Sequence, residues 1–281
     1  MSGVLKSTSD RQIRPGARVI AVTSGKGGVG KTNLVVNLSL ALARLGRRVI
    51  ILDADLGLAN VEVLMGVTPP YTLFDCVCGT KEIGEILTPA PLGVQIISGG
   101  SGFLELANLD ARQQQKIIAA LDLLDDADFI LIDTGAGISR NVLGFVAAAE
   151  EVIVVLTPEP TSLTDAYSLI KILAKFRVHR RVLLVVNRAA DEREAAAVAK
   201  RMLTVAERFL EIDLVHLGSI CEDRVVSRAV RRQQPFILFA PDSGPAAGIN
   251  FLAQRLVNGQ AFVPPGGNFR GFLQKIIHFF R

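Results

Sequence analysis

Residue types that hold a triphosphate occur together near the start of the chain, in SGKGGVGKTN at residues 24–33. The segment fits the pattern G-x-x-x-x-G-K-[ST], in which a glycine-rich loop surrounds phosphate oxygens with backbone N–H groups. Its lysine, Lys31, reaches the outer phosphates and its hydroxyl residue, Thr32, is a ligand for Mg²⁺. We therefore expect ATP and Mg²⁺ to bind here. The residues expected to bind nucleotide are Gly25, Lys26, Gly27, Gly28, Val29, Gly30, Lys31, Thr32 and Asn33.

The same segment contains a second lysine, Lys26, five positions before Lys31. A phosphate-binding loop of this kind needs one lysine, so the role of the other is not explained by the pattern. Lys26 is either a solvated loop residue or a further cation for the bound phosphates.

Three aspartates follow apolar segments in positions that suit a metal-bound triphosphate. Asp53 and Asp55 end the segment IILDAD, and Asp133 ends ILID. An aspartate at the carboxyl end of a parallel strand faces the ligand crevice, and a carboxylate there holds the Mg²⁺ shell. We expect Thr32, Asp53 and Asp133 to serve the metal. Asp53 and Asp55 could instead cap a turn.

Short apolar segments alternate with longer amphipathic ones along most of the chain. The segments that predict strands are 18–24, 48–55, 94–98, 129–135, 151–158, 181–188 and 213–220. The segments that predict helices are 31–45, 111–124, 140–149, 161–176, 191–210 and 222–232. Alternation of this kind predicts an α/β fold, a doubly wound, mostly parallel sheet with helices on both faces. The strand before residue 25 and the helix after residue 30 argue against a glycine-rich turn that binds nothing.

Composition is that of a folded protein that carries only a small excess of positive charge. The chain has 281 residues, 49% of them hydrophobic and 21% charged, with a formal net charge of +4. Three cysteines and the absence of a signal-type or membrane-spanning apolar run predict a cytoplasmic protein. We expect a polar leader at 1–16, one domain at 17–258 and a Pro/Gly connector at 259–268.

The segment 269–281 predicts an amphipathic helix. Its apolar side consists of Phe269, Phe272, Leu273, Ile276, Ile277, Phe279 and Phe280, and its other side is basic. A short, basic, Phe-rich helix is typical of an anchor that lies in a membrane interface and prefers anionic lipid. Docking on the protein's own core or on a partner protein are the alternatives.

Several of these motifs together resemble a known family. KGGVGKT, DADLGLANVEVLMG and DTGAGIS resemble the deviant Walker-A ATPases, the family of MinD and ParA. LDADLGLANV, EPTSLTDAYSLIK and VVNR are similar to its FleN/FlhG branch, the regulators of flagellar number. The resemblance covers about residues 17 to 258.

The resemblance implies roles for individual residues. Lys26 would be the signature lysine, which crosses the interface of an ATP-sandwiched homodimer and contacts the phosphates held by the other subunit. Lys26, Lys31 and Asp55 would be catalytic, with Asp55 positioning the attacking water. The segments 55–60 and 133–139 would be the two switches. The residues implied for the base are Asn187, Arg188, Ile220 and Glu222.

The resemblance also implies a function and its partners. The protein would be an ATP-dependent dimerising switch that cycles between the cytosol and the inner membrane and restricts flagellar number. Its partners would be anionic lipid, a flagellar master transcription factor and an FlhF-type GTPase. A MinD-like division-site ATPase or a ParA-like partition ATPase is the alternative, although we do not expect DNA binding. An iron–sulfur carrier is a weaker alternative, because Cys76, Cys78 and Cys221 include no Cys-x-x-Cys pair.

Overall fold

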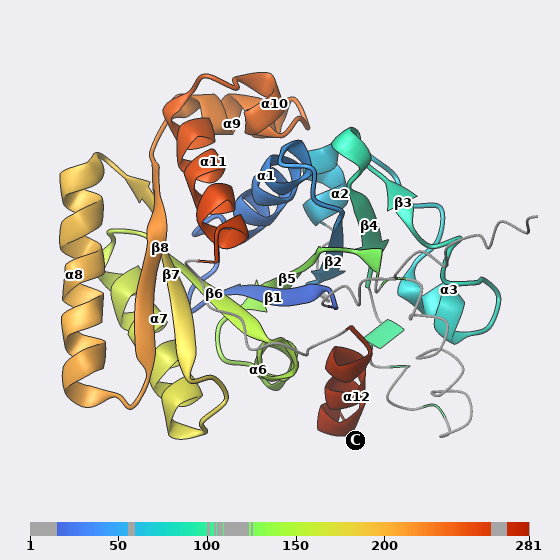
Figure 1. Cartoon of the computed structure of the whole chain (residues 1–281), viewed down its shortest axis with the longest axis horizontal. Helices are drawn as coiled ribbons and strands as arrows, with labels where there is room; N and C mark the ends of the chain where they lie inside the picture. The colour runs from blue at the N-terminus through green and yellow to red at the C-terminus, as the bar shows by residue number, and fades with distance from the viewer. Residues whose placement is uncertain are drawn as a thin grey trace, which may run out of the picture.

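A single eight-stranded sheet forms the centre of the protein (Figure 1). The computed structural model describes residues 16–55, 60–99, 126–259 and 269–280, together with residues 102, 103, 105, 109 and 124. The predicted helix 111–124 lies outside these residues except for its last position, as do nearly all of the predicted leader and connector. The proposed domain boundaries at 1–16 and 259–268 therefore stay predictions.

The strands are arranged in the order β3-β4-β2-β5-β1-β6-β7-β8. Their bounds are β1 Arg18–Ser24, β2 Val49–Ala54, β3 Thr88–Pro89, β4 Gln95–Ser98, β5 Phe129–Ala136, β6 Glu151–Leu156, β7 Arg181–Ala189 and β8 Asp213–Cys221. Only the short β3 is antiparallel to its neighbour, and the other neighbouring pairs are parallel. The prediction of a mostly parallel sheet is confirmed.

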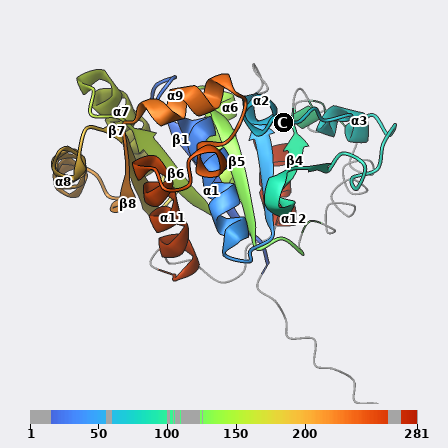
Figure 2. The ribbon, with the colours of Figure 1, turned by 90° about the horizontal axis from the view of Figure 1, so that it is seen from above.

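Helices cover both faces of the sheet (Figures 1 and 2). On one face lie α1 Lys31–Arg44, α2 Asn60–Met65, α9 Arg224–Arg231, α10 Phe236–Phe239 and α11 Gly244–Val257. On the other face lie α3 Leu73–Val77, α6 Arg140–Ala148, α7 Pro160–Lys175, α8 Glu192–Phe209 and α12 Phe269–Phe280. Because both faces are covered, β1, β2 and β6 are almost wholly buried, which explains their nearly unbroken apolar sequences. The doubly wound class is confirmed.

Helix α11 is the longest described element that the sequence pattern did not predict. It begins in DSGPAAG, which is typical of a loop, and it carries two glycines. Its small residues allow close packing, since a Cβ at Gly248 would lie 2.8 Å from the Ser219 carbonyl oxygen of β8. The buried side chains of α11 pack against α1 and β8. Tertiary contact therefore stabilises a helix that its local sequence does not favour.

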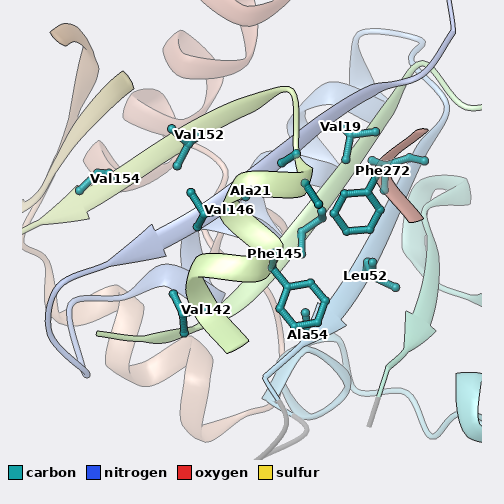
Figure 3. Close-up of a cluster of buried hydrophobic side chains, with 14 of the residues drawn as sticks. Val19, Ala21, Leu52, Ala54, Val142, Phe145, Val146, Val152, Val154 and Phe272 are labelled. Atoms are coloured by element: carbon teal, nitrogen blue, oxygen red, sulfur yellow. The ribbon is translucent and has the colours of Figure 1, made fainter. Parts of the chain in front are cut away.

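The C-terminal segment forms the predicted amphipathic helix, and its apolar side is docked on the protein's own core. Phe272, Leu273, Ile276 and Ile277 are each at most 6% exposed. Figure 3 shows the Phe272 ring among residues of β1, β2 and α6. The side chains of Phe269 and Phe280 lie outside the described part of the structure. In this arrangement the four buried side chains are not available to a membrane.

Helix α6 provides the surface on which α12 rests. A Cβ at Gly144 would lie 2.6 Å from the Phe279 ring, so any other residue there would have to displace that ring. The Arg140 guanidinium also donates a hydrogen bond to the Phe279 carbonyl oxygen at 3.1 Å. In the described segments, no helix combines the length and the apolar character that crossing a bilayer would require.

Candidate functional site

The glycine-rich loop joins the end of β1 to the start of α1. Gly28 and Gly30 have φ values of 78° and 94°, which place them in the left-handed region that favours glycine. Gly30 is the N-cap of α1 and brings no side chain to cap it, so the first N–H groups of the helix are directed toward the loop. A Cβ at Gly25 would overlap the backbone of Asp165 in α7. The loop thus has the shape and the helix end that bind an anion.

Lys31 is almost buried at the first position of α1, where its side chain faces carboxylates. It is 8% exposed, and burial lowers its pKa, while the charges of Asp133 and Asp55 act in the opposite direction. The structure therefore brings together Lys31, Asp133 and Asp55, which were predicted to serve the phosphates, the metal and the attacking water, respectively.

Asp53 and Asp133 lie side by side at the carboxyl ends of β2 and β5, where they are register partners. Asp133 is fully buried, and neither of its carboxylate oxygens has a well-formed hydrogen bond among the described residues, although the Thr32 hydroxyl is near enough to favour its ionised form. Burial raises the pKa of Asp133 to about 7, against the opposing influence of Thr32 and Lys31. Burial also raises the pKa of Asp53 to about 7, and the charge of Asp133 adds to this shift.

Asp53 also organises the chain that follows β2. Its two carboxylate oxygens accept hydrogen bonds from the backbone N–H of Asp55 at 3.1 Å and of Val61 at 3.4 Å. Val61 lies in α2, beyond residues 56–59, which are outside the described part of the chain. The turn-capping role that the sequence left open for Asp53 is therefore present, and its role at a metal stays a prediction.

The chemistry of this cluster fits Mg²⁺. The ion prefers oxygen ligands, and a buried carboxylate without a partner is costly unless a cation or proton compensates it. Asp133 supplies such a carboxylate, with the Thr32 hydroxyl beside it and Asp53 on the neighbouring strand. Asp133 and Thr32 would hold the ion, and Asp53 would complete its surroundings.

Lys26 lies at the exposed rim of the loop and makes different contacts from Lys31. Its ammonium is 3.0 Å from the Glu159 carboxylate and 3.0 Å from the Thr161 hydroxyl, both at the start of α7. The hydrogen bond and charge of Lys26 hold the pKa of Glu159 below its usual value. Exposed ion pairs of this kind are weak, so Lys26 is easily drawn to another anion.

A cavity of about 720 Å³ adjoins the loop and collects the residues implied for the base. Asn187, Arg188, Ile220 and Glu222 all line it, beside Gly28, Gly30 and Asn33 of the loop. Arg188 donates to Glu222 at 2.9 Å, so its guanidinium is held at the mouth of the cavity. The apolar wall of the cavity, which no sequence motif predicted, comprises Leu34, Val226, Val230 and Phe236. Its only signal was the apolar side of the helix predicted at 222–232.

The described residues offer no support for an iron–sulfur carrier or for a DNA-binding ATPase. Cys76 and Cys78 are at α3, whereas Cys221 ends β8 at one edge of the sheet, and all three are free thiols. No group of three or more His, Cys, Asp or Glu side chains in the described ranges could hold a metal ion. DNA binding would use basic side chains such as those of the segment 177–181. There, Arg181 pairs with Asp213 and the His179 ring is hydrogen-bonded to the Val146 carbonyl oxygen.

Comparisons with known proteins agree with this geometry. Residues 20–236 match the family model described as the CobQ/CobB/MinD/ParA nucleotide binding domain. The chain is 41% identical over 261 residues to the antiactivator FleN of Pseudomonas aeruginosa, covering 92% of this chain and 93% of that protein. It is 32% identical to the flagellum site-determining protein YlxH of Helicobacter pylori, and the match covers 93% of this chain and 90% of that protein. Its fold matches that of the septum site-determining protein MinD of Pyrococcus horikoshii, complexed with Mg-ADP. That match has a TM-score of 0.68 and 29% identity, and covers 88% of this chain and 98% of that one.

The raised pKa values predict how the stability of the nucleotide-free protein depends on pH. Asp53 and Asp133 bind protons more tightly in the folded than in the unfolded protein, so stability should fall as pH rises from about 4 to about 7. Asp133→Asn cannot ionise and should stabilise the nucleotide-free protein at pH 8 by a few kcal/mol. Thermal unfolding at pH 5.5 and pH 8 measures both effects. Equal pH dependence in wild type and variant would contradict the burial of an ionised Asp133.

Proposed function

The chain belongs to the CobQ/CobB/MinD/ParA family of nucleotide-binding proteins, and we propose that it is a switch that dimerises on ATP, hydrolyses it and restricts flagellar number. The flagellar role is supported by the likeness to FleN, which is named an antiactivator, and to YlxH, which is named a flagellum site-determining protein. Both matches extend over nine-tenths or more of this chain and of its relatives.

The observation that carries the switch is the separation of the two loop lysines. Lys31 is buried beside Asp133 and Asp55, within its own nucleotide site. Lys26 is at the exposed rim, where it makes a weak ion pair with Glu159 and a hydrogen bond to the Thr161 hydroxyl. A second copy of the protein that presents bound triphosphate gives Lys26 a stronger anionic partner. Two copies facing each other across two nucleotides would each lend a cation to the other, as an arginine finger does.

Hydrolysis would use residues that already surround the loop. Lys31 would contact the outer phosphates, while Thr32 and Asp133 would hold Mg²⁺, which neutralises phosphate charge when it is bound. Asp55 lies near the end of β5, where its carboxylate is 3.7 Å from the position that a Cβ at Gly135 would take. From there it would orient the attacking water, so that dimerisation and turnover share one site.

Release of the docked helix α12 would let the switch change where the protein is located. Helix α6 begins at Arg140, directly after the predicted switch segment 133–139, and α12 packs on α6. A change at the phosphates that moves this segment would shift the surface under Phe279 and release α12. Released helices would bind anionic lipid weakly one at a time, and a dimer with two of them would bind much more strongly. The protein would then be cytoplasmic without ATP and peripheral on the inner membrane with it.

The proposed protein partners follow from the relatives and not from a surface of this chain. A flagellar master transcription factor is one candidate, and an FlhF-type GTPase is the other. Both would bind the ATP-dependent dimer, since dimerisation would create a surface that the single chain does not present.

The first test of this function is the Lys26→Ala variant. With a non-hydrolysable ATP analogue, wild type should double its mass in light scattering from 30.2 kDa, whereas Lys26→Ala should stay monomeric and bind the analogue within about threefold as tightly. The control is Lys200→Ala, which removes an exposed lysine from α8 and should dimerise normally.

The same variants test the biological role in a strain that lacks the gene. Lys200→Ala should restore the normal number of flagella, and Lys26→Ala should leave extra ones. A wild-type protein that stays monomeric with the analogue would contradict the switch. Normal flagella accompanied by minicells in the deletion strain would favour the division-site alternative.

The second test concerns the tail. Gly144→Leu places a large side chain where the Phe279 ring packs, so α12 should undock without nucleotide. This variant should sediment with anionic vesicles in the absence of ATP, whereas wild type should need ATP. Gly84→Leu is the matched control, because a Cβ at Gly84 has open space around it. Adding Phe272→Asp to Gly144→Leu should abolish sedimentation, and retained sedimentation would show that another surface binds the vesicles.

A further inference from the structure

The side chain of Asn187 is already engaged with the phosphate loop. Its amide nitrogen donates a hydrogen bond to the Val29 carbonyl oxygen at 2.7 Å, and its amide oxygen accepts one from the Arg188 backbone N–H at 3.0 Å. Asn187 is 9% exposed at the end of β7, far from the loop in sequence. Its contact with Val29 is therefore a tertiary one that joins two separate parts of the site.

The backbone on both sides is shaped around this contact. Gly30 follows Val29 with a φ of 94°, and a Cβ there would overlap the Asn187 amide nitrogen. Arg188 has a φ of 58°, which is uncommon for a residue with a side chain, and its N–H donates to the Asn187 oxygen. The pair between Arg188 and Glu222 fixes the outer side of the same turn. Strain of this kind persists only where the surroundings stabilise it.

The amide of Asn187 still has capacity for a ligand. An asparagine side chain carries two N–H donors and an oxygen with two lone pairs, and the contacts to Val29 and Arg188 use one of each. Asn187 also lines the cavity that adjoins the loop, so a ligand there would be the partner for the remaining donor and lone pair. One side chain can therefore contact a base and the phosphate loop at the same time.

We propose that Asn187 is a positioning residue for the phosphate loop, which holds Val29 and Gly30 in the phosphate-binding shape and couples that shape to occupation of the base cavity. The proposal rests on the nucleotide site of the proposed function. Its consequence is specific: removing the Asn187 amide should weaken binding of a ligand that has phosphates and no base. A residue that served only to recognise the base would have no such effect.

The experiment compares ATP with inorganic tripolyphosphate, each with Mg²⁺, by titration calorimetry on the full chain. Asn187→Ala should weaken tripolyphosphate binding about tenfold, because the Val29 carbonyl loses its hydrogen bond and the loop its support. Asn187→Asp keeps the volume and an acceptor for Arg188 but lacks the donor, and it should show the same loss. Asn258→Ala is the control, since it removes an exposed asparagine at the end of α11, which is not among the residues that line the cavity. It should bind tripolyphosphate as wild type does.

Amide hydrogen exchange without ligand gives a second readout that does not depend on binding. Exchange across residues 25–32 should be faster in both Asn187 variants, with α8 unchanged as an internal control for folding. Variants that lose ATP affinity but keep wild-type tripolyphosphate binding and loop exchange would overturn the inference. A wild-type protein that binds tripolyphosphate but not ATP would contradict the proposed function and leave the inference on the loop standing. One that binds neither would overturn both.

Discussion

Two buried carboxylates on adjacent strands, one of them facing a nearly buried lysine, are the constraint on which this structure depends. Asp133 and Asp53 are register partners at the ends of β5 and β2, and Lys31, the first residue of α1, faces Asp133. Burial makes their ionised forms costly, which is why both acids have a pKa of about 7. The folded chain thus contains a site whose charges are balanced only in part. Bound Mg²⁺ would compensate the carboxylates while the triphosphate would pair with Lys31 and the loop N–H groups, and binding energy would be available to drive a conformational change.

The parallel sheet explains how one ligand can reach so many parts of the molecule. Strands β1, β2, β5, β7 and β8 all end at the same edge, so the loop, the carboxylates and the base cavity are neighbours although they are distant in sequence. Helix α6 leaves the same edge and carries the docked α12. Lys26, at the rim, is the group that a second copy would meet. The nucleotide site, the proposed dimer interface and helix α12 are therefore connected through neighbouring elements.

The sequence predicted those features whose residues are contiguous or periodic. The phosphate loop is a contiguous pattern, the strand-end aspartates follow apolar segments, and the apolar side of α12 is visible as a helical period. Features that depend on tertiary contact were not predictable in the same way. Helix α11 has a loop-like start and forms because it packs on α1 and β8. The docking of α12 depends on the space that Gly144 leaves, and the bond from Asn187 to Val29 joins segments that no local pattern connects. The sequence placed Asn187 at the base and did not indicate its contact with the loop.

The most direct measurement of the central claim is the number of protons released when Mg²⁺-ATP binds. If the ligand completes a site whose two carboxylates are about half protonated at pH 7, binding should release about one proton there and almost none at pH 8.5. Calorimetry in buffers of different ionisation enthalpy measures this number, and Asp133→Asn should lower it. A wild-type protein that releases no protons at either pH would contradict the claim that these buried acids form the binding site.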